Sequence, residues 1–316
     1  MKKAILLCLL IFLAALSGCL GFGSKSTPAT SPMGLGQTKG AEITEFSSIP
    51  YIDEGEPLDV SIYVQNFGDT VASNVMATLY QKSGFYEDRD KTIIEGGDLL
   101  PPDKEFDIPG DVYSKSWQLT APSVEADQDR SFLCKVTYGY QSTASSNIQL
   151  VGKSEWDSRG GAGAFSTYST SSEGPVTLKI IEVPAIRISV VNDDGTKTVP
   201  IDILFKNTGT GLIENKEVSG FELSVKKGNQ LMIFARGDTT NNFIDEYETA
   251  GIDCGSYVNN GVVELFGVKQ ERSMRCYLTL PFDTEADYSG YIVEASIDYK
   301  YSVHSDPLTV NVRMQR

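Results

Sequence analysis

Five cysteines and one histidine are the residues with the most distinctive chemistry in this 316-residue sequence. A single histidine, His304, excludes a metal site or proton relay built from several histidines. His304 precedes Ser305, Asp306 and Pro307, and no Gly-x-Ser-x-Gly elbow lies nearby to supply a nucleophile. We therefore expect His304 to be a solvated turn histidine, and we expect a protein without catalytic residues that is not an enzyme.

Cys19 follows a stretch with the pattern of an export signal. Lys2 and Lys3 precede an apolar run, and the small residues Ser17 and Gly18 stand immediately before Cys19. The segment from Leu16 to Cys19 resembles the lipobox of lipoprotein signals. That resemblance implies that residues 1–18 are a signal peptide and that Cys19 becomes the lipid-bearing first residue. The alternatives are an uncleaved membrane anchor and plain secretion, and all three place the remaining chain outside the cytoplasm.

Residues 19–40 are rich in glycine, serine, threonine and proline and contain few apolar residues. Such a composition predicts a flexible tether with a root-mean-square reach of roughly 25 Å. Two long acyl chains on Cys19 would hold the protein at a membrane almost permanently. The sequence therefore predicts a lipid-anchored protein of the cell membrane that faces away from the cytoplasm.

Cys254 and Cys276 are candidates for a disulfide because bridges persist in exported proteins. A bridge across 22 residues would stabilise the fold by roughly 3 kcal/mol in the chain-entropy model. Two separate thiols are the alternative. Cys134 alternates with Phe132, Val136 and Tyr138, so we expect it to be a small buried core residue.

An acidic segment is the best candidate for a metal site, and it is a weak one. Its oxygen-bearing side chains are Asp238, Asn242, Asp245 and Glu246. Calcium prefers several oxygen ligands from one loop, but the spacing fits no calcium-loop pattern. A solvated, charged loop is the alternative, and we predict that the protein has no cofactor.

The overall charge restricts the class of partner. The chain has 27 basic and 42 acidic residues, which gives a formal charge of −15. Proteins that bind nucleic acids rely on basic patches against phosphates, so we expect no nucleic-acid partner.

Most of the chain shows the alternation of β-strands. Apolar and polar residues alternate over residues 58–65, 201–206, 221–225 and 308–314. No long segment has helical spacing. The pattern predicts an all-β protein.

Three ordered pairs of segments indicate an internal repeat. The pairs are Val60–Gly68 with Ile201–Gly209, Leu119–Pro122 with Leu278–Pro281, and Val136–Tyr140 with Ile297–Tyr301. The second copy has about 18 extra residues, expected between Gly228 and Tyr257. The strand spacing of each copy is typical of a β-sandwich. We predict β-sandwich domains at residues 41–152 and 176–316, the second with an inserted loop.

The segment Leu58–Tyr80 carries a family resemblance. An apolar strand ends in Asn66-Phe67-Gly68 and is followed by an Ala-x-x-Val pattern and a second strand. This arrangement resembles the cell-adhesion-related (CARDB-like) immunoglobulin-like modules of bacterial and archaeal envelope proteins, and residues 200–225 match more loosely. The resemblance implies two tandem immunoglobulin-like sandwiches and brings no catalytic residues with it.

Residues 153–175 between the two copies are a Gly/Ser-rich linker that contains Trp156, Phe165 and Tyr168. These aromatic rings either pack against the sandwiches and fix their angle or anchor a partner.

The sequence thus favours a non-catalytic interaction, adhesion or structural module whose partner is another envelope protein or a surface glycan. The alternatives are a substrate-capture lipoprotein of a transporter and an accessory module of a carbohydrate-acting envelope enzyme. A deep polar pocket with clustered carboxylates would favour these alternatives.

Overall fold

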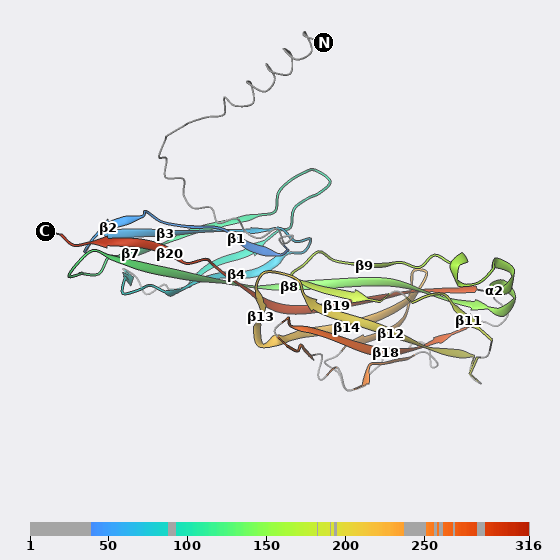
Figure 1. Ribbon diagram of the computed structural model, residues 1–316. Coiled ribbons are helices and arrows are strands. Elements are labelled where there is room, and N and C mark those ends of the chain that lie inside the picture. Colours follow the sequence, from blue (N-terminus) through green and yellow to red (C-terminus); the bar gives the residue numbers. More distant parts are fainter. Residues whose placement is uncertain are drawn as a thin grey trace, which may run out of the picture. The chain divides into compact units, whose positions relative to one another are not determined.

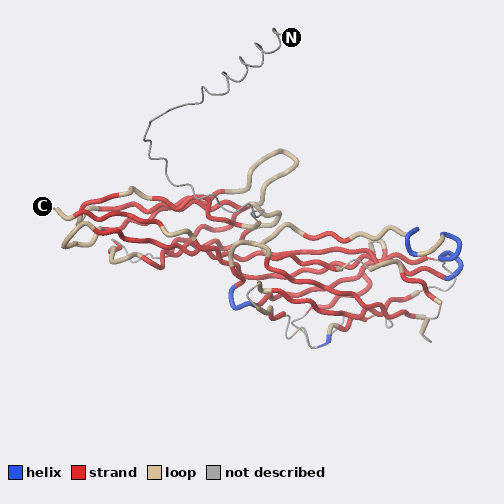
Figure 2. The backbone as a smooth tube through the Cα atoms, in the orientation of Figure 1, coloured by secondary structure: helices blue, strands red, loops and turns tan. Residues whose placement is uncertain are grey.

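The structure is a computed structural model of the chain. It describes residues 39–87, 93–181, 183–189, 191–192, 195–236, 251–255, 258, 262–267, 269–282 and 288–315. Residues 37–316 form one compact unit. Strands dominate it (Figure 2), so the predicted all-β fold is confirmed.

Two four-stranded sheets repeat the same strand order. The first is ordered β1 (Ala41–Ser47), β3 (Pro57–Asn66), β7 (Val112–Thr120), β5 (Tyr86–Glu87), and the second β10 (Val176–Ile180), β12 (Thr196–Asn207), β18 (Glu271–Pro281), β16 (Gly251–Asp253). In β3, Leu58, Val60, Ile62 and Val64 are buried while the residues between them are not. The period-two pattern thus places one apolar face of each sheet in the core.

The remaining twelve strands of the described residues form one sheet that serves both halves of the chain. At its centre β8 (Gln128–Gly152) runs antiparallel to β19 (Tyr288–His304), from Tyr288 opposite Val151 to His304 opposite Lys135. Strand β20 (Leu308–Arg313) continues along β8, with Leu308 opposite Phe132. The long strands β8 and β19 can be followed in Figure 1.

The other strands of this sheet flank that central pair. They are β2 (Tyr51–Asp53), β4 (Ala72–Gln81), β6 (Ile93–Leu99), β9 (Ser169–Ser171), β11 (Ile186–Ile188), β13 (Leu212–Ile213), β14 (Glu217–Lys227), β15 (Gln230–Arg236) and β17 (Val263–Glu264). Buried side chains of the large sheet and of both four-stranded sheets belong to one hydrophobic cluster. Each half is therefore a two-layered sandwich whose second layer is part of the shared sheet.

The two copies of the repeat are related by a local two-fold arrangement of β8 and β19. Tyr138 and Tyr140 of the first copy correspond to Tyr299 and Tyr301 of the second, and in the sheet Tyr138 lies opposite Tyr301 and Tyr140 opposite Tyr299. The short flanking strands correspond as well. β2 of the first copy runs parallel to β20, and β11 of the second copy likewise runs parallel to the end of β8. The second copy thus has the strand topology of the first.

The two copies exchange their last strands. The second part of β8, from Gln141 onward, pairs with β19 of the second copy, whereas β20 at the chain's end pairs with residues 128–132 of the first. One sandwich therefore consists of residues 39–139 and 300–315, which we call the N-terminal half. The other consists of residues 140–299, which we call the inserted half.

This arrangement differs from two domains at residues 41–152 and 176–316. No turn interrupts β8, so its end crosses into the inserted half instead of folding back on its own copy. The predicted linker, residues 153–175, contains helix α2 (Lys153–Arg159), the short 3-10 helix η1 (Ala162–Ala164) and strand β9, which pairs with β8. These residues are therefore part of the inserted half.

Candidate binding surface

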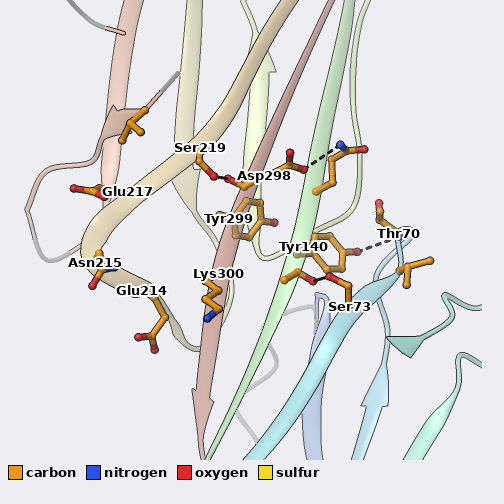
Figure 3. Close-up of a pocket in the computed structure, with 14 residues that line it drawn as sticks. Thr70, Ser73, Tyr140, Glu214, Asn215, Glu217, Ser219, Asp298, Tyr299 and Lys300 are labelled. Atoms are coloured by element: carbon orange, nitrogen blue, oxygen red, sulfur yellow. Dashed lines mark hydrogen bonds between the residues drawn. The ribbon is translucent and has the colours of Figure 1, made fainter. Parts of the chain in front are cut away.

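A hollow of about 570 Å³ lies where the N-terminal and inserted halves meet (Figure 3). Its lining includes Gln141 of β8, Asp298 of β19 and Ser219 of β14 from the inserted half, and Thr70 and Ser73 from the N-terminal half. The Gln141 side-chain amide donates to the Asp298 carboxylate at 3.1 Å, and the Ser219 hydroxyl donates to the Asp298 carbonyl at 3.1 Å. Polar side chains held in this way present fixed donors and acceptors to a ligand.

A second hollow, of about 650 Å³, lies further along the same strands. Thr143 and Ser296, which line it, are the next outward positions after Gln141 and Asp298. Because successive outward residues of a strand are two positions apart, the two hollows lie on one surface. We call this surface the polar face and define it by Ser219, Glu222, Ser224 and Lys226 of β14, Glu294, Ser296 and Asp298 of β19, and Gln141, Thr143 and Ser145 of β8.

Charge on the two hollows is predominantly negative. Six carboxylates and two lysines line them: Asp69, Glu214, Glu217, Glu222, Glu294, Asp298, Lys226 and Lys300. Lys226 pairs with Glu294 at 2.5 Å. A polyanion would be repelled from such a surface, which agrees with the overall charge.

Backbone strain accompanies the first hollow. Asn215, which lines it, has a left-handed φ of 59°, and the next residue, Lys216, has a φ of 58°. Such conformations cost free energy in residues other than glycine and often occur at functional positions.

Four tyrosines of β8 and β19 support this region from the buried side of the sheet. The Tyr140 hydroxyl accepts the Thr70 N–H at 3.1 Å and donates to the Glu173 carbonyl at 3.1 Å. In the corresponding position, the Tyr301 hydroxyl accepts the Gly211 N–H and donates to the Asn207 side chain, both at 2.9 Å. Burial raises the pKa of Tyr140 to about 12, so the hydroxyl keeps its proton.

Tyr140 and Tyr301 also fix the Asn-x-Gly turns of the repeat. Asn66 uses its side-chain oxygen to accept the Gly68 N–H at 3.0 Å, and Asn207 does the same with Gly209 at 3.2 Å. Tyr140 binds the residue four positions after Asn66, and Tyr301 binds the residue four positions after Asn207. The Asn-x-Gly turn and the tyrosine are thus one repeated unit that holds the shared sheet to each four-stranded sheet.

We expect Tyr140→Phe and Tyr301→Phe each to lower the free energy of unfolding by about 1–2 kcal/mol, because each leaves a partly buried N–H without its acceptor. Urea denaturation measures the effect. Tyr86→Phe is the matched control, since Tyr86 is exposed. If all three variants unfolded at the same urea concentration as the parent, these hydroxyls would have no supporting role.

A buried carboxylate joins the two halves. Glu42 of β1 is only 4% exposed, and the Thr210 hydroxyl of the inserted half lies 3.0 and 2.9 Å from its two oxygens. Burial raises the pKa of Glu42 to about 7, and the hydrogen bond from Thr210 opposes that shift. The charge of this junction therefore changes near neutral pH.

Trp156 and Phe165 of the predicted linker stack on each other, with ring centroids 5.9 Å apart. Phe165 also stacks on Tyr288 at 6.4 Å, and Arg159 lies 5.3 Å above the Phe165 ring. Tyr168 is 44% exposed, and its backbone pairs with Asn147. The structure thus brings Trp156 and Phe165 together in a small cluster at the end of β8, and Tyr168 remains the accessible ring.

The three cysteines in the described part of the chain lie where their sequence contexts indicate. Cys254 and Cys276 form a disulfide. Cys134 is fully buried, and burial raises the pKa of its thiol to about 12, so it is unreactive at neutral pH. Cys19 lies outside the described residues.

His304 ends β19 rather than occupying a turn. It is exposed, and its Nδ1 lies 3.4 Å from the Tyr80 hydroxyl. The calcium candidates Asp238, Asn242, Asp245 and Glu246 lie outside the described residues. Among the residues that are described, no group of three or more histidine, cysteine or acidic side chains could hold a metal ion.

The polar face is not among the sites that the sequence predicts. Its signal in the sequence is an unbroken series of polar residues at alternate positions of β8: Gln141, Thr143, Ser145 and Asn147. The same pattern is typical of an ordinary solvated strand. In the part of the chain that is described, no helix is long and apolar enough to span a membrane.

No protein-family model matches the chain, and no curated protein does either. The collagen-binding domain of the Erysipelothrix rhusiopathiae surface protein RspB aligns over 86% of this chain and 93% of its own, at 9% identity and a TM-score of 0.16. The CupB6 tip adhesin of Pseudomonas aeruginosa aligns over 88% and 97%, at 8% identity and a TM-score of 0.14.

A structure of infectious bursal disease virus, Gt strain, aligns over 85% of this chain and 86% of its own, at 10% identity and a TM-score of 0.12. TM-scores this low carry no argument about function. The fold itself defines the class: the chain is an all-β protein of two sandwiches joined by a shared sheet.

Proposed function

We propose that this protein is a lipid-anchored, non-catalytic module of the cell envelope that binds a partner through the polar face. The observation that carries the proposal is the position of two adjacent polar hollows on one surface of the shared sheet. Strands are better platforms for such a surface than loops, because backbone pairing fixes the direction of each side chain. Lipid on Cys19 confines the module to the membrane, and the partner is another envelope protein or a surface glycan.

Membrane fractionation tests the anchor. We expect the parent chain in the membrane fraction and Cys19→Ala in the soluble fraction, since the acylated thiol is the attachment point. The control is Cys134→Ala, which removes a buried thiol and leaves the anchor in place. If Cys19→Ala stayed in the membrane fraction, lipid attachment at Cys19 would be refuted.

Photocrosslinking in intact cells tests the polar face. A crosslinkable residue at Ser296, in the second hollow, is expected to give a discrete adduct, whereas one at Ser114, an exposed residue of β7, is expected to give none. Protease or glycosidase treatment then shows whether the adduct is a protein or a glycan. If neither position gave an adduct, or both gave the same one, the polar face would not be the binding site.

Capture of a small solute is the second candidate. The volumes of the two hollows, about 570 and 650 Å³, fall within the range of small-molecule sites. In that case a low-molecular-mass adduct at Ser296 that resists both protease and glycosidase would replace the macromolecular one.

A further inference from the structure

An exposed apolar loop lines neither hollow of the polar face and has no role in the function proposed above. It joins β6 to β7 and comprises residues 100–111. Leu100, Phe106 and Ile108 are 56%, 69% and 56% exposed, and Val112 at the start of β7 is 55% exposed. Clustered apolar exposure of this kind marks a surface that contacts a partner or a membrane.

Hydrogen bonds hold the loop in one conformation. Asp103 and Ile108 form a two-way backbone bridge with N–O distances of 2.9 and 3.0 Å. The Asp103 carboxylate accepts the N–H groups of Glu105 and Phe106 at 3.0 and 3.2 Å. The Phe106 backbone is thus fixed before any contact is made, which lowers the entropic cost of that contact.

The base of the loop lies beside the first described residues of the chain. The N–H of Asn66 donates to the Asp111 carbonyl at 3.2 Å, while the next N–H, of Phe67, donates to the Gly40 carbonyl at 2.8 Å. Gly110 is pressed against the same turn, since a Cβ there would lie 2.0 Å from the Asn66 carbonyl oxygen. The chain therefore enters the fold next to this loop.

The position of Gly40 determines what the loop can reach. Under the proposed function, lipid sits on Cys19, and 20 residues separate Cys19 from Gly40. A flexible chain of that length has a root-mean-square reach of roughly 25 Å, so this end of the fold stays close to the bilayer. Confinement of this kind raises the effective concentration of the loop at the membrane and makes even weak insertion significant.

We propose that Phe106 and Ile108 insert into the interfacial region of the membrane that holds Cys19, so that the N-terminal half docks on the bilayer. This inference rests on the proposed lipid anchor. The neighbouring side chains of Glu105 and Asp107 are exposed, and Lys104 is paired with Glu173 at 2.6 Å. The loop therefore favours a zwitterionic surface over an anionic one, because its free charges are negative.

Tryptophan fluorescence on vesicles tests the insertion. The chain from residue 19 onward is coupled through the Cys19 thiol to maleimide lipid in phosphatidylcholine vesicles with brominated acyl chains. Chemical coupling replaces the biological anchor, so this result is independent of the Cys19→Ala fractionation. We expect the additional emission of Phe106→Trp to shift to the blue and to be quenched at least twofold.

Phe266→Trp is the matched control, because Phe266 is 56% exposed and lies in the inserted half. Its added emission is expected to remain unquenched. Equal quenching of both variants would indicate non-specific adsorption and overturn the proposal, as would unquenched emission from Phe106→Trp. The uncoupled chain gives a second readout: Phe106→Ser should weaken its binding to phosphatidylcholine vesicles about tenfold, and tighter binding to phosphatidylglycerol vesicles at low salt would contradict the charge argument.

Discussion

Residues 39–138 followed by Asn-Gly and residues 301–315 are expected to fold as a single sandwich without the inserted half. Tyr138 and Tyr301 lie directly opposite each other in neighbouring antiparallel strands, so a two-residue turn can join them as a hairpin. The product keeps every strand of the N-terminal half, including β20. Circular dichroism and urea denaturation should show β-structure and one cooperative transition.

A chain of residues 39–152, which ends where the sequence places a domain boundary, is expected not to fold. It lacks β20, whose Val310 and Val312 are fully buried in the parent structure. Loss of two such side chains costs about 3–6 kcal/mol, comparable to the whole stability of a small domain. The truncated chain also lacks the residues of the inserted half that cover the side chains of Ile148 and Leu150, which are fully buried in the parent structure. A cooperative transition for this chain would show that the strand exchange is not required.

Glu42→Gln is expected to stabilise the protein by about 3 kcal/mol at pH 8 and to have little effect at pH 4. Burial raises the pKa of Glu42 to about 7 from an ordinary value of 4.5. The stability contributed by the protonated form is therefore fully present below pH 4.5 and is lost as the pH rises through 7. Each unit of pKa corresponds to about 1.4 kcal/mol, and a neutral amide avoids the cost of burying a charge.

Urea denaturation at pH 4, 6 and 8 measures this difference between variant and parent. Glu45→Gln is the control, because Glu45 lies three residues further along β1 and is exposed. The stabilisation by Glu42→Gln should grow with pH, whereas that of Glu45→Gln should not. If both variants followed the parent at all three pH values, Glu42 would not titrate as a buried group.

The sequence predicts the strands and the repeat well because both depend on local patterns. Alternation in β3 and β12 identifies their buried faces, and the Asn-x-Gly turns at Asn66 and Asn207 mark equivalent positions. The pairing of Cys254 with Cys276 also follows from their spacing and context. These features need no knowledge of distant contacts.

The strand exchange could not be predicted in this way. Residues 141–152 present the same alternating face whether they fold back on residues 128–138 or cross to β19, so the two pairings bury the same side chains. Only the absence of a turn near Gly139 distinguishes the two pairings. A glycine at that position favours a turn, and therefore suggests that the strand folds back on its own copy. The polar face depends on this exchange, because Gln141, Thr143 and Ser145 come from the crossing strand.

Pairs of introduced cysteines test the strand exchange most directly. Ser131 lies opposite Thr309, and Ser145 lies opposite Glu294. We expect Ser131→Cys with Thr309→Cys, and Ser145→Cys with Glu294→Cys, to form disulfides within the monomer, detected by mass spectrometry of unreduced peptides. In contrast, Ser131→Cys with Asn147→Cys should stay reduced. A disulfide between positions 131 and 147, with none in the other two pairs, would show that each copy keeps its own last strand and would contradict the shared sheet.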